Sequence, residues 1–541
     1  MKRVLVVGGY GGFGLRLSRR LASDGWAVLV AGRDRAKAEA AARDLPGAEG
    51  VWFDRTGNCQ VGLTALHPDL VIDAAGPFQT CDYGLPRACI AAAVPYFDLA
   101  DARAFVCGIG ELDADARKAG VPVISGASSV PALSAAVVHD LAQGLDRIAA
   151  IDTAISATTR ASSGLAVVRA ALSYAGQPIR LWRSGRWEAE SGWSLARQVR
   201  FAAPGAAPLR RRVALAEVPD LELFPALYPG APACTFRGGS EFGLQMRALG
   251  LLGWIVQRGW LRSAAPLASW LAPLQQGTAR LGGQRSAMQV EVRGWAGTRP
   301  VLRRWTVIAE QGQGQEIPTF AAQLLARRLI AGQLQAGART AAGELCLADF
   351  GDLFAGLPVS LGVEEETILP LYRRILGARF AALAPQLQAL HQPLSECAAQ
   401  GQASVARGKG PLAWLLGLVM QFPPAGDYPL EVRFVPQSGR ERWTRHFGPH
   451  RFSSEMGEGP EGTLTERFGP MRFHFALDVD PAGALAMRLR GWSVLGLPMP
   501  LSLAPRIAAG EHGRDGRFHF DVAVTMPLIG PVVHYRGWLK P

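Results

Sequence analysis

The chain has few cysteines, and no pattern among them indicates a metal site or a disulfide framework. Seven cysteines occur in 541 residues, an odd number, and no two of them form a Cys-x-x-Cys pair. Small secreted domains are held together by paired cysteines, and structural zinc is bound by closely spaced ones. Both classes are therefore disfavoured. We expect no metal site, and a reducing, cytoplasmic location is favoured.

Long hydrophobic runs are also missing. The two most apolar internal stretches are 249–274, which Arg258, Arg262 and Pro266 interrupt, and 412–422, which is too short to span a bilayer. The apolar run at the N-terminus ends at Gly8, after too few residues for the core of a signal peptide. We expect the two internal stretches to form buried core helices. The alternative is that they lie on a membrane surface, which leaves a peripheral membrane contact open.

A clustered basic surface is missing too, despite a formal net charge of +12. The basic residues are scattered, and their longest run is 210–212. Nucleic-acid-binding proteins usually carry a basic face with interleaved aromatic residues or a known reading motif. We therefore expect no nucleic-acid partner, while the positive charge leaves a modest attraction to anionic ligands.

What the chain does contain is an alternation of strand and helix patterns over its first 125 residues. Short apolar runs typical of buried parallel strands occur at 4–7, 26–31, 50–53, 70–74, 96–99 and 121–124, and helices are expected at 15–23, 36–45 and 85–93. This alternation predicts an α/β fold, with a doubly wound parallel sheet of the Rossmann type over residues 1–130.

Beyond residue 130 the pattern changes. Strands expected at 151–157, 288–292 and 304–309 predict a second, α+β domain with an antiparallel sheet over 131–316. A helix over 319–330 is expected within the segment 317–350. Residues 365–541 combine a helical pattern at 372–390 with short strand-like runs from Leu430 onward, and predict a C-terminal β-rich α+β domain.

A glycine-rich segment follows the first predicted strand and opens the first predicted helix. It reads Gly8, Gly9, Tyr10, Gly11, Gly12, Phe13, Gly14. In a G-x-G-x-x-G motif the first glycine allows the tight turn, the second lets the backbone approach a pyrophosphate, and the third lets the helix pack close to the sheet. The free N–H groups of the helix N-terminus then face the anion. The segment predicts a dinucleotide-binding loop.

The end of the second predicted strand favours NADP over NAD. NAD-binding proteins usually place an acidic residue there to hold the ribose 2′-OH. Here the strand ends in Ala31-Gly32 and Arg33 follows, and a guanidinium can pair with a 2′-phosphate through two hydrogen bonds. Asp34 leaves two alternatives open, because it could take the acidic role or cap the next helix.

Two further segments at strand ends complete the predicted cofactor site. Asp54 follows the third strand and could meet the adenine, or could be a surface turn residue. The small residues of the loop after the fourth strand would let a cofactor lie across the strand ends, and the loop comprises Ala75, Gly76, Pro77 and Phe78.

Together these segments resemble the NADP-binding domain of saccharopine dehydrogenase-like oxidoreductases. The likeness is carried by 8–14, 31–33, 74–78, 94–99 and 125–131, and it covers about residues 1–345. The resemblance implies that the helix near 318–330 returns to the Rossmann domain and that two chains pair through the second domain. It also implies oxidation or reduction of an amino-acid-derived or lipid-like substrate. Residues 365–541 resemble a domain of unknown function sometimes fused behind such dehydrogenases.

Three side chains near the strand ends are candidate catalytic groups: Tyr83, Asp98 and Asp101. Asp98 could orient a substrate or donate a proton through water. For each of the three, the alternative is a structural role, such as capping a helix or accepting hydrogen bonds from backbone amides. Asp101 also departs from the pattern of the resembling family, which carries a glycine at this position, and this departure argues against amino-acid substrates.

Three hypotheses for the function follow. The first is an NADP(H)-dependent oxidoreductase acting on a small or lipid-like substrate. The second is a dinucleotide-binding regulator or scaffold without turnover. The third is a lipid-binding protein of the membrane surface. It predicts an apolar cavity within 365–541 or an exposed apolar face on 249–274.

Overall fold

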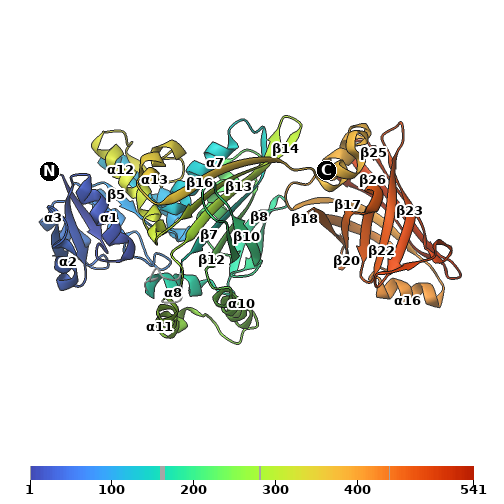
Figure 1. Ribbon diagram of the computed structural model, residues 1–541, viewed down its shortest axis with the longest axis horizontal. Helices are drawn as coiled ribbons and strands as arrows, with labels where there is room; N and C mark the ends of the chain where they lie inside the picture. The colour runs from blue at the N-terminus through green and yellow to red at the C-terminus, as the bar shows by residue number, and fades with distance from the viewer. Residues whose placement is uncertain (1, 159–164, 280–281, 438, 541) are drawn as a thin grey trace. The chain divides into compact units, whose positions relative to one another are not determined.

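The computed structural model describes residues 2–158, 165–279, 282–437 and 439–540 (Figure 1). The chain divides into two compact units. The first comprises Met1–Trp182, Trp187–Gly297 and Val301–Glu366, and the second comprises Arg183–Arg186, Thr298–Pro300 and Thr367–Pro541. Each unit is described by itself below.

The N-terminal part of the first unit is built on a seven-stranded parallel sheet, which confirms the predicted α/β fold. The strands, in sheet order, are β15 (Gly337–Thr340), β6 (Pro122–Ser125), β5 (Tyr96–Asp98), β4 (Leu70–Asp73), β1 (Arg3–Val7), β2 (Ala27–Gly32) and β3 (Glu49–Trp52). Val4, Leu5 and Val6 on β1 are all fully buried, as expected of a strand covered on both faces.

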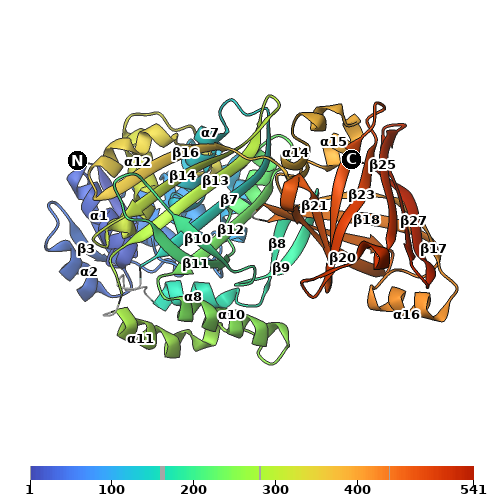
Figure 2. The ribbon, with the colours of Figure 1, turned by 45° about the vertical axis from the view of Figure 1, so that its right-hand side comes forward.

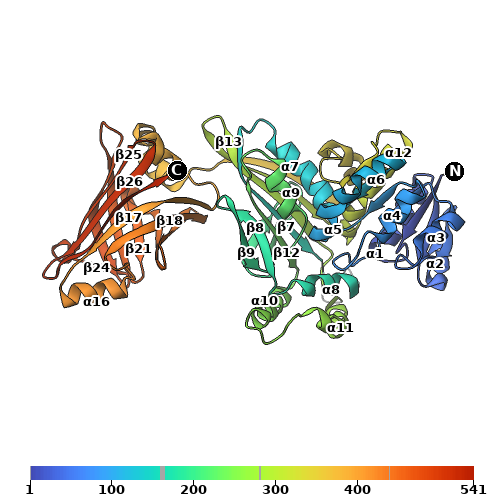
Figure 3. The same ribbon diagram turned by 180° about the vertical axis from the view of Figure 1, so that it is seen from behind.

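Helices connect successive strands of this sheet and lie against it (Figure 3). They are α1 (Gly12–Ser23), α2 (Arg35–Ala42), α3 (Cys59–Leu66), α4 (Gly84–Ala91), α5 (Arg103–Gly108) and α6 (Asp113–Ala119). A later helix, α12 (Phe320–Ile330), packs on α1, where Arg20 pairs with Glu316 at 2.9 Å and Arg327 with Asp24 at 2.7 Å.

The second lobe of this unit is a seven-stranded sheet with helices, as the α+β prediction required. The order is β10 (Arg197–Phe201), β11 (Leu209–Leu215), β12 (Ala233–Ser240), β7 (Arg147–Ala157), β13 (Ser286–Ala296), β14 (Arg299–Ala309) and β16 (Val359–Thr367). The sheet is mixed, because β12 runs parallel to β7 while β13 runs antiparallel to it. The remaining elements are α7 (Ser134–Ala142), α8 (Leu165–Ser173), β8 (Pro178–Arg183), β9 (Arg186–Ser191), α9 (Asp220–Leu227), α10 (Gly243–Gln257), α11 (Ala268–Ala279) and α13 (Gly351–Ala355).

The expectation that 249–274 forms buried core helices is wrong. This stretch spans parts of α10 and α11, and both present apolar side chains to solvent. Leu251, Trp254, Trp260 and Trp270 are all exposed. The physical reason is that only one side of α10 packs on the core, through Met246, Gly253 and Val256, so the apolar side chains on its other side stay uncovered.

The second unit is a closed antiparallel barrel, which confirms the predicted β-rich C-terminal domain (Figure 2). Ten strands close into a ring because β22 pairs with both β21 and β23, and β24 adds to β23 outside it. The strands are β17 (Cys397–Arg407), β18 (Gly426–Gln437), β19 (Arg440–Phe447), β20 (His450–Glu458), β21 (Leu464–Phe468), β22 (Met471–Val479), β23 (Leu485–Val494), β24 (Leu497–Met499), β25 (Arg506–Arg514), β26 (Arg517–Met526) and β27 (Gly530–Lys540).

Three short α-helices accompany the barrel in the part of the unit that the structure describes: α14 (Leu371–Leu376), α15 (Pro385–Leu390) and α16 (Pro411–Val419). The single helix expected over 372–390 is therefore wrong. Gly377 has a φ of 55°, which ends α14, and Pro385 begins α15. The second stretch expected to be buried, 412–422, contains α16, and its outward face is exposed.

Candidate functional site

The candidate site lies at the carboxyl edge of the parallel sheet, where β1 and β4 are neighbours. From β1 the chain crosses to β2 and β3 on one side, and from β4 it continues to β5 and β6 on the other. Doubly wound sheets bind their ligands at this reversal. The loops after the two strands meet here, because a Cβ on Gly8 would lie 2.9 Å from the Cα of Ala75.

The glycine loop has the backbone geometry that its sequence predicts. Gly8 adopts a φ of 75°, and the N–H groups of Gly8 and Gly9 donate to the Ala31 carbonyl at 2.8 and 3.0 Å. A Cβ on Gly14 would lie 2.1 Å from the Gly8 carbonyl oxygen, so α1 can pack this close only without a side chain. Gly9 is similarly enclosed, with a would-be Cβ 2.8 Å from the Val6 oxygen.

The first turn of α1 leaves backbone donors free for a ligand. Gly11 caps the helix without a side-chain hydrogen bond, and the first intrahelical bond runs from the Leu15 N–H to the Gly11 oxygen at 2.9 Å. The N–H groups of Gly12, Phe13 and Gly14 therefore have no carbonyl partner within the helix. Such a helix end attracts a phosphate, because its N–H groups and its dipole both favour negative charge. Gly12 and Phe13 are exposed at this position.

Arg33 and Asp34 at the end of β2 have different roles. Asp34 caps α2: its carboxylate accepts from the Lys37 N–H at 3.1 Å and pairs with the Lys37 ammonium at 3.1 Å. Asp34 therefore has the geometry of a helix cap, rather than that of an acidic residue that holds a ribose. Arg33 is exposed, and within the described residues its guanidinium makes no hydrogen bond or ion pair, although its charge interacts with that of Asp54. Its guanidinium is therefore available to an anionic ligand.

Asp54 stands after β3, close enough to Arg33 for the two charges to interact. One Asp54 oxygen accepts hydrogen bonds from the N–H and the hydroxyl of Thr56, at 2.9 and 2.8 Å. The backbone bond to Thr56 is the main cause that lowers the pKa of Asp54. The carboxylate is thus ionised and held in a turn at the edge of the site.

The loop after β4 is braced by an ion pair that the sequence did not reveal. Arg55 pairs with the buried Asp73 at 2.9 Å and donates to the Ala75 carbonyl at 2.6 Å. The same guanidinium lies 4.9 Å from the ring centroid of Phe78, which is buried. Gly76 and Pro77 span the exposed turn between these anchors.

Tyr10 is a second site residue that the sequence reasoning missed. Its ring packs on Gly32, where a Cβ would lie 2.3 Å from the ring, and its hydroxyl accepts from the Asp34 N–H at 3.3 Å. The small residue at the end of β2 is therefore explained by the tyrosine from the glycine loop. The sequence did contain a signal for this contact: a tyrosine, Tyr10, lies between Gly9 and Gly11, and a glycine, Gly32, ends the next strand.

Asp98 at the end of β5 is fully buried and ties the loop after β5 to the end of β6. One carboxylate oxygen accepts from the Gly126 N–H at 2.8 Å, the Ala100 N–H at 3.0 Å and the Ser125 hydroxyl at 3.0 Å. The second oxygen has no hydrogen-bond partner among the described residues. Burial raises the pKa of Asp98 to about 7, against the opposing effect of these bonds. Asp98 thus accepts hydrogen bonds from backbone amides, which is the structural role considered for it as the alternative to catalysis.

Tyr83 and Asp101 differ in how far they can reach a ligand. The Tyr83 hydroxyl donates to the Phe105 carbonyl at 2.7 Å, and burial raises the pKa of Tyr83 to about 12. Asp101 keeps an exposed side chain, although the protein around it desolvates the carboxyl and raises its pKa. Asp101 also interacts electrostatically with Tyr174 of the second lobe. Among the three candidates, Asp101 is thus the one with an exposed side chain.

Arg103 fastens the second lobe to this edge of the sheet. It is nearly buried, pairs closely with Glu222 on α9, and donates to the Arg180 carbonyl on β8 at 2.7 Å. Groups from the second lobe are therefore held at a fixed place relative to Asp101.

Comparison with known proteins adds one family model, and it covers less than half of the chain. Residues 383–539 match a domain of unknown function, DUF4166. No curated protein matches the chain in sequence. The described residues hold no cluster of three or more His, Cys, Asp or Glu side chains arranged for a metal. None of the helices in these residues combines the length and the apolar character needed to cross a bilayer.

Several solved structures are similar to parts of the chain. An amine dehydrogenase from Mycobacterium smegmatis aligns at 11% identity over 63% of this chain and 95% of its own, with a TM-score of 0.38. A 3-hydroxyacyl-CoA dehydrogenase type-2 from Mycobacterium avium aligns at 23% over 23% of this chain and 71% of its own, with a TM-score of 0.20. An oxidoreductase of the short chain dehydrogenase/reductase family from Burkholderia thailandensis aligns at 17% over 23% and 66%, with a TM-score of 0.20.

These structural neighbours are dehydrogenases and reductases, the class of protein in which the glycine loop and the sheet order are typical. At such identities and scores the likeness carries no weight for the function of this chain. The functional proposal therefore rests on the geometry of the site.

Proposed function

We propose that the chain is an NADP(H)-dependent oxidoreductase of the saccharopine dehydrogenase-like type. The observation that supports this most is the glycine loop at the β1–β4 reversal, where the free N–H groups of Gly12, Phe13 and Gly14 and the unpaired guanidinium of Arg33 stand at the same sheet edge. NADP needs this combination, since it carries a pyrophosphate and a 2′-phosphate.

The residues present fit the cofactor. Gly8, Gly9 and Gly14 have no room for a Cβ, so the loop backbone is held open to a pyrophosphate by contacts with Ala75, Val30 and the loop itself. Arg33 would hold the 2′-phosphate, and Asp54 would meet the adenine. When bound, the nicotinamide supplies hydride transfer. The chain's own part is to bind the cofactor, to orient a substrate and to handle a proton.

Asp101 is the residue that we propose to meet the substrate. Its side chain is exposed at the carboxyl edge and its charge interacts with Tyr174, whereas Asp98 and Tyr83 make hydrogen bonds to groups inside the protein. A carboxyl whose pKa is raised can hold a proton closer to neutral pH, as a general acid requires. The substrate remains open between amino-acid-derived and lipid-like molecules.

A second candidate is a dinucleotide-binding regulator without turnover. It is favoured by the internal bonding of Tyr83 and Asp98, which leaves Asp101 as the one exposed acid of the three. Replacement of Asp101 by Asn separates the two candidates. An enzyme would lose turnover of any substrate found by an NADPH fluorescence screen while keeping NADPH affinity. A regulator would show no turnover before or after the change.

The first experiment is calorimetric titration of the full chain with NADPH and with NADH. We expect tighter binding of NADPH, and a loss of about 10- to 100-fold for NADPH alone in Arg33→Ala, because charge-assisted hydrogen bonds contribute about 1.5–3 kcal/mol. Arg43→Ala is the matched control, since Arg43 is exposed at the other end of α2. Equal binding of both nucleotides, or no binding, would overturn the proposal.

A further inference from the structure

The two ends of the C-terminal barrel differ, and the strand register identifies them. Arg506 pairs with Thr525 and Met471 with Val494, so the neighbouring loops leave the barrel at the same end. This end carries the loops 408–425, 448–449, 469–470, 495–505 and 527–529, and we call it the α16 end. The opposite end is covered by the segment of α14 and α15, whose Ala384 N–H donates to the Gly483 carbonyl at 2.9 Å.

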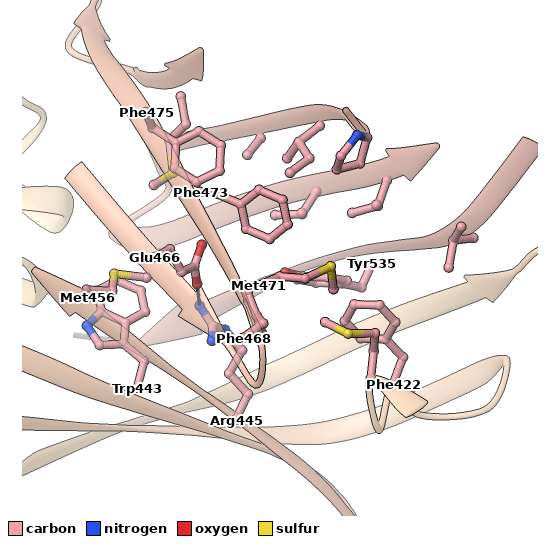
Figure 4. Close-up of a pocket in the computed structure, with 18 of the residues that line it drawn as sticks. Phe422, Trp443, Arg445, Met456, Glu466, Phe468, Met471, Phe473, Phe475 and Tyr535 are labelled. Atoms are coloured by element: carbon pink, nitrogen blue, oxygen red, sulfur yellow. Dashed lines mark hydrogen bonds and ion pairs between the residues drawn. The ribbon is translucent and has the colours of Figure 1, made fainter. Parts of the chain in front are cut away.

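The barrel encloses an apolar cavity that reaches the α16 end (Figure 4). The space between its lining atoms, open mouth included, is about 930 Å³, of which about 100 Å³ is open to the centre of a water molecule. This is far more than the space one water molecule needs. Leu416 and Met420 cover it from α16, and Val522, Val524 and Ile507 line its wall.

Methionine is concentrated in this cavity to an unusual degree. The whole chain has nine methionines. Five of them line the cavity: Met420, Met456, Met471, Met487 and Met526. Flexible thioether side chains adapt to ligands of varied shape, and they are common on surfaces that bind many apolar partners. The lining therefore suits an apolar ligand better than a tightly specified polar one.

A small cluster of polar side chains lies in the cavity, and its members already bond to one another or to a neighbour. Arg445 donates to Ser454 at 2.9 Å and pairs with Glu466 at 3.3 Å (Figure 4), and Glu511 pairs with the buried His391 at 2.6 Å. A ligand with a net charge would upset these pairs in a place of low solvent exposure. A small uncharged polar end, such as a hydroxyl, can exchange hydrogen bonds with them without adding charge.

The α16 end also carries most of the exposed apolar surface of this unit. Among the described residues of 367–540, ten large apolar side chains are exposed, and nine of these are in the loops of the α16 end. They are Leu412, Trp414, Leu415, Leu418, Leu495, Leu497, Leu501, Leu503 and Leu528. A patch of this kind around the mouth of an apolar cavity marks an interaction surface.

The charge around the same end is predominantly positive. Exposed basic side chains stand in or beside its loops: Lys409, Arg451, Arg467, Arg472 and Arg506. Asp427 is the acidic side chain beside them. Apolar side chains surrounded by basic ones complement a bilayer that contains anionic lipids, since each basic residue near such a surface adds to the attraction.

We infer that the C-terminal barrel docks with its α16 end on an anionic phospholipid bilayer and takes up from it one apolar molecule with an uncharged polar end. The exposed face of α16 enters the lipid interface, while Leu416 and Met420 on its inner face cover the cavity mouth. This role is separate from the dinucleotide site and does not depend on it.

Docking is tested by co-sedimentation of the full chain with vesicles of phosphatidylcholine alone and with a third of phosphatidylserine. We expect binding to the anionic vesicles, weakened by salt, and a loss of at least tenfold in Trp414→Ser with Leu418→Ser. Arg506→Glu should also weaken binding, whereas Arg514→Glu, at the other end of the same strand, should not. Unchanged binding in the α16 variants, or equal effects of the two charge reversals, would overturn docking at this end.

The cavity is tested with the uncharged fluorescent probe N-phenyl-1-naphthylamine. We expect saturable binding that 1-decanol displaces more effectively than decanoate at pH 8. Val522→Trp should fill the cavity and abolish probe binding, while Ala523→Trp, whose side chain points to the other side of β26, should not. Met526→Trp gives a second test near the mouth if Val522→Trp fails to fold. Probe binding that survives both cavity variants, or preference for decanoate, would overturn the assignment.

Discussion

Gly14→Ala is the change that tests the nucleotide loop most directly. The added Cβ would lie 2.1 Å from the Gly8 carbonyl oxygen, whereas carbon and oxygen atoms normally approach to about 3.3 Å. Either the loop or the first turn of α1 must therefore move by about 1 Å. Overpacking of this kind costs about 1–3 kcal/mol of stability.

The same shift would remove donors from a bound pyrophosphate. A displacement of about 1 Å takes a hydrogen bond beyond its useful length, and each charge-assisted bond contributes about 1.5–3 kcal/mol. We therefore expect NADPH affinity in calorimetry to fall by about tenfold or more for each bond lost.

Gly12→Ala provides the matched control on the same helical turn. A Cβ there would meet nothing within 4 Å, and alanine is favoured over glycine in helices by about 1 kcal/mol. Its melting temperature should be unchanged or higher, while that of Gly14→Ala should be lower. If Gly14→Ala binds NADPH as tightly as the wild type, the loop between β1 and α1 does not hold the cofactor and the reasoning is refuted.

Three other changes test buried charges. Burial raises the pKa of Asp98 from 3.8 to about 7, so the folded chain keeps a proton that the unfolded chain releases, and its stability falls as pH rises between these values. Asp98→Asn removes this loss of stability, because asparagine does not titrate. The melting temperature of the variant relative to wild type should therefore rise from pH 5 to pH 8. A difference that does not change with pH would contradict the raised pKa of Asp98. Arg55→Ala leaves Asp73 buried without its cation and should cost about 3 kcal/mol in urea denaturation, and a cost below about 1 kcal/mol would mean that the pair contributes no more than a surface one. Glu466→Ala should destabilise the barrel by a similar amount because it strands Arg445, and a neutral effect would show that the guanidinium finds other partners.

The parallel sheet and its glycine loop could be predicted because their signals are local. A buried strand such as 4–7 is a continuous apolar run, and the glycines that follow it are required by contacts within one turn of chain. The helix cap formed by Asp34 was predictable for the same reason. It depends on a hydrogen bond to Lys37, only three residues away, and it was one of the two roles considered for Asp34.

The features that could not be predicted depend on contacts distant in sequence. Arg55 and Asp73 are brought together only by the pairing of sheet strands, and β15 has a four-residue sequence without any periodic apolar pattern. The exposure of α16 was missed for another reason. Its sequence is apolar on both faces, so hydrophobicity alone does not tell which face the barrel covers.

The position of β15 bears on how the chain can be synthesised and divided. This strand pairs with β6, although six of the seven strands of the second sheet lie between them in the sequence. During translation the N-terminal sheet is therefore incomplete until residue 340 has left the ribosome, and β6 meanwhile presents an open edge. Open edges invite pairing with other chains. We expect a fragment of residues 1–130 to aggregate where one of residues 1–367, which also keeps β16 on the second sheet, does not. Light scattering of the two purified fragments would show the difference.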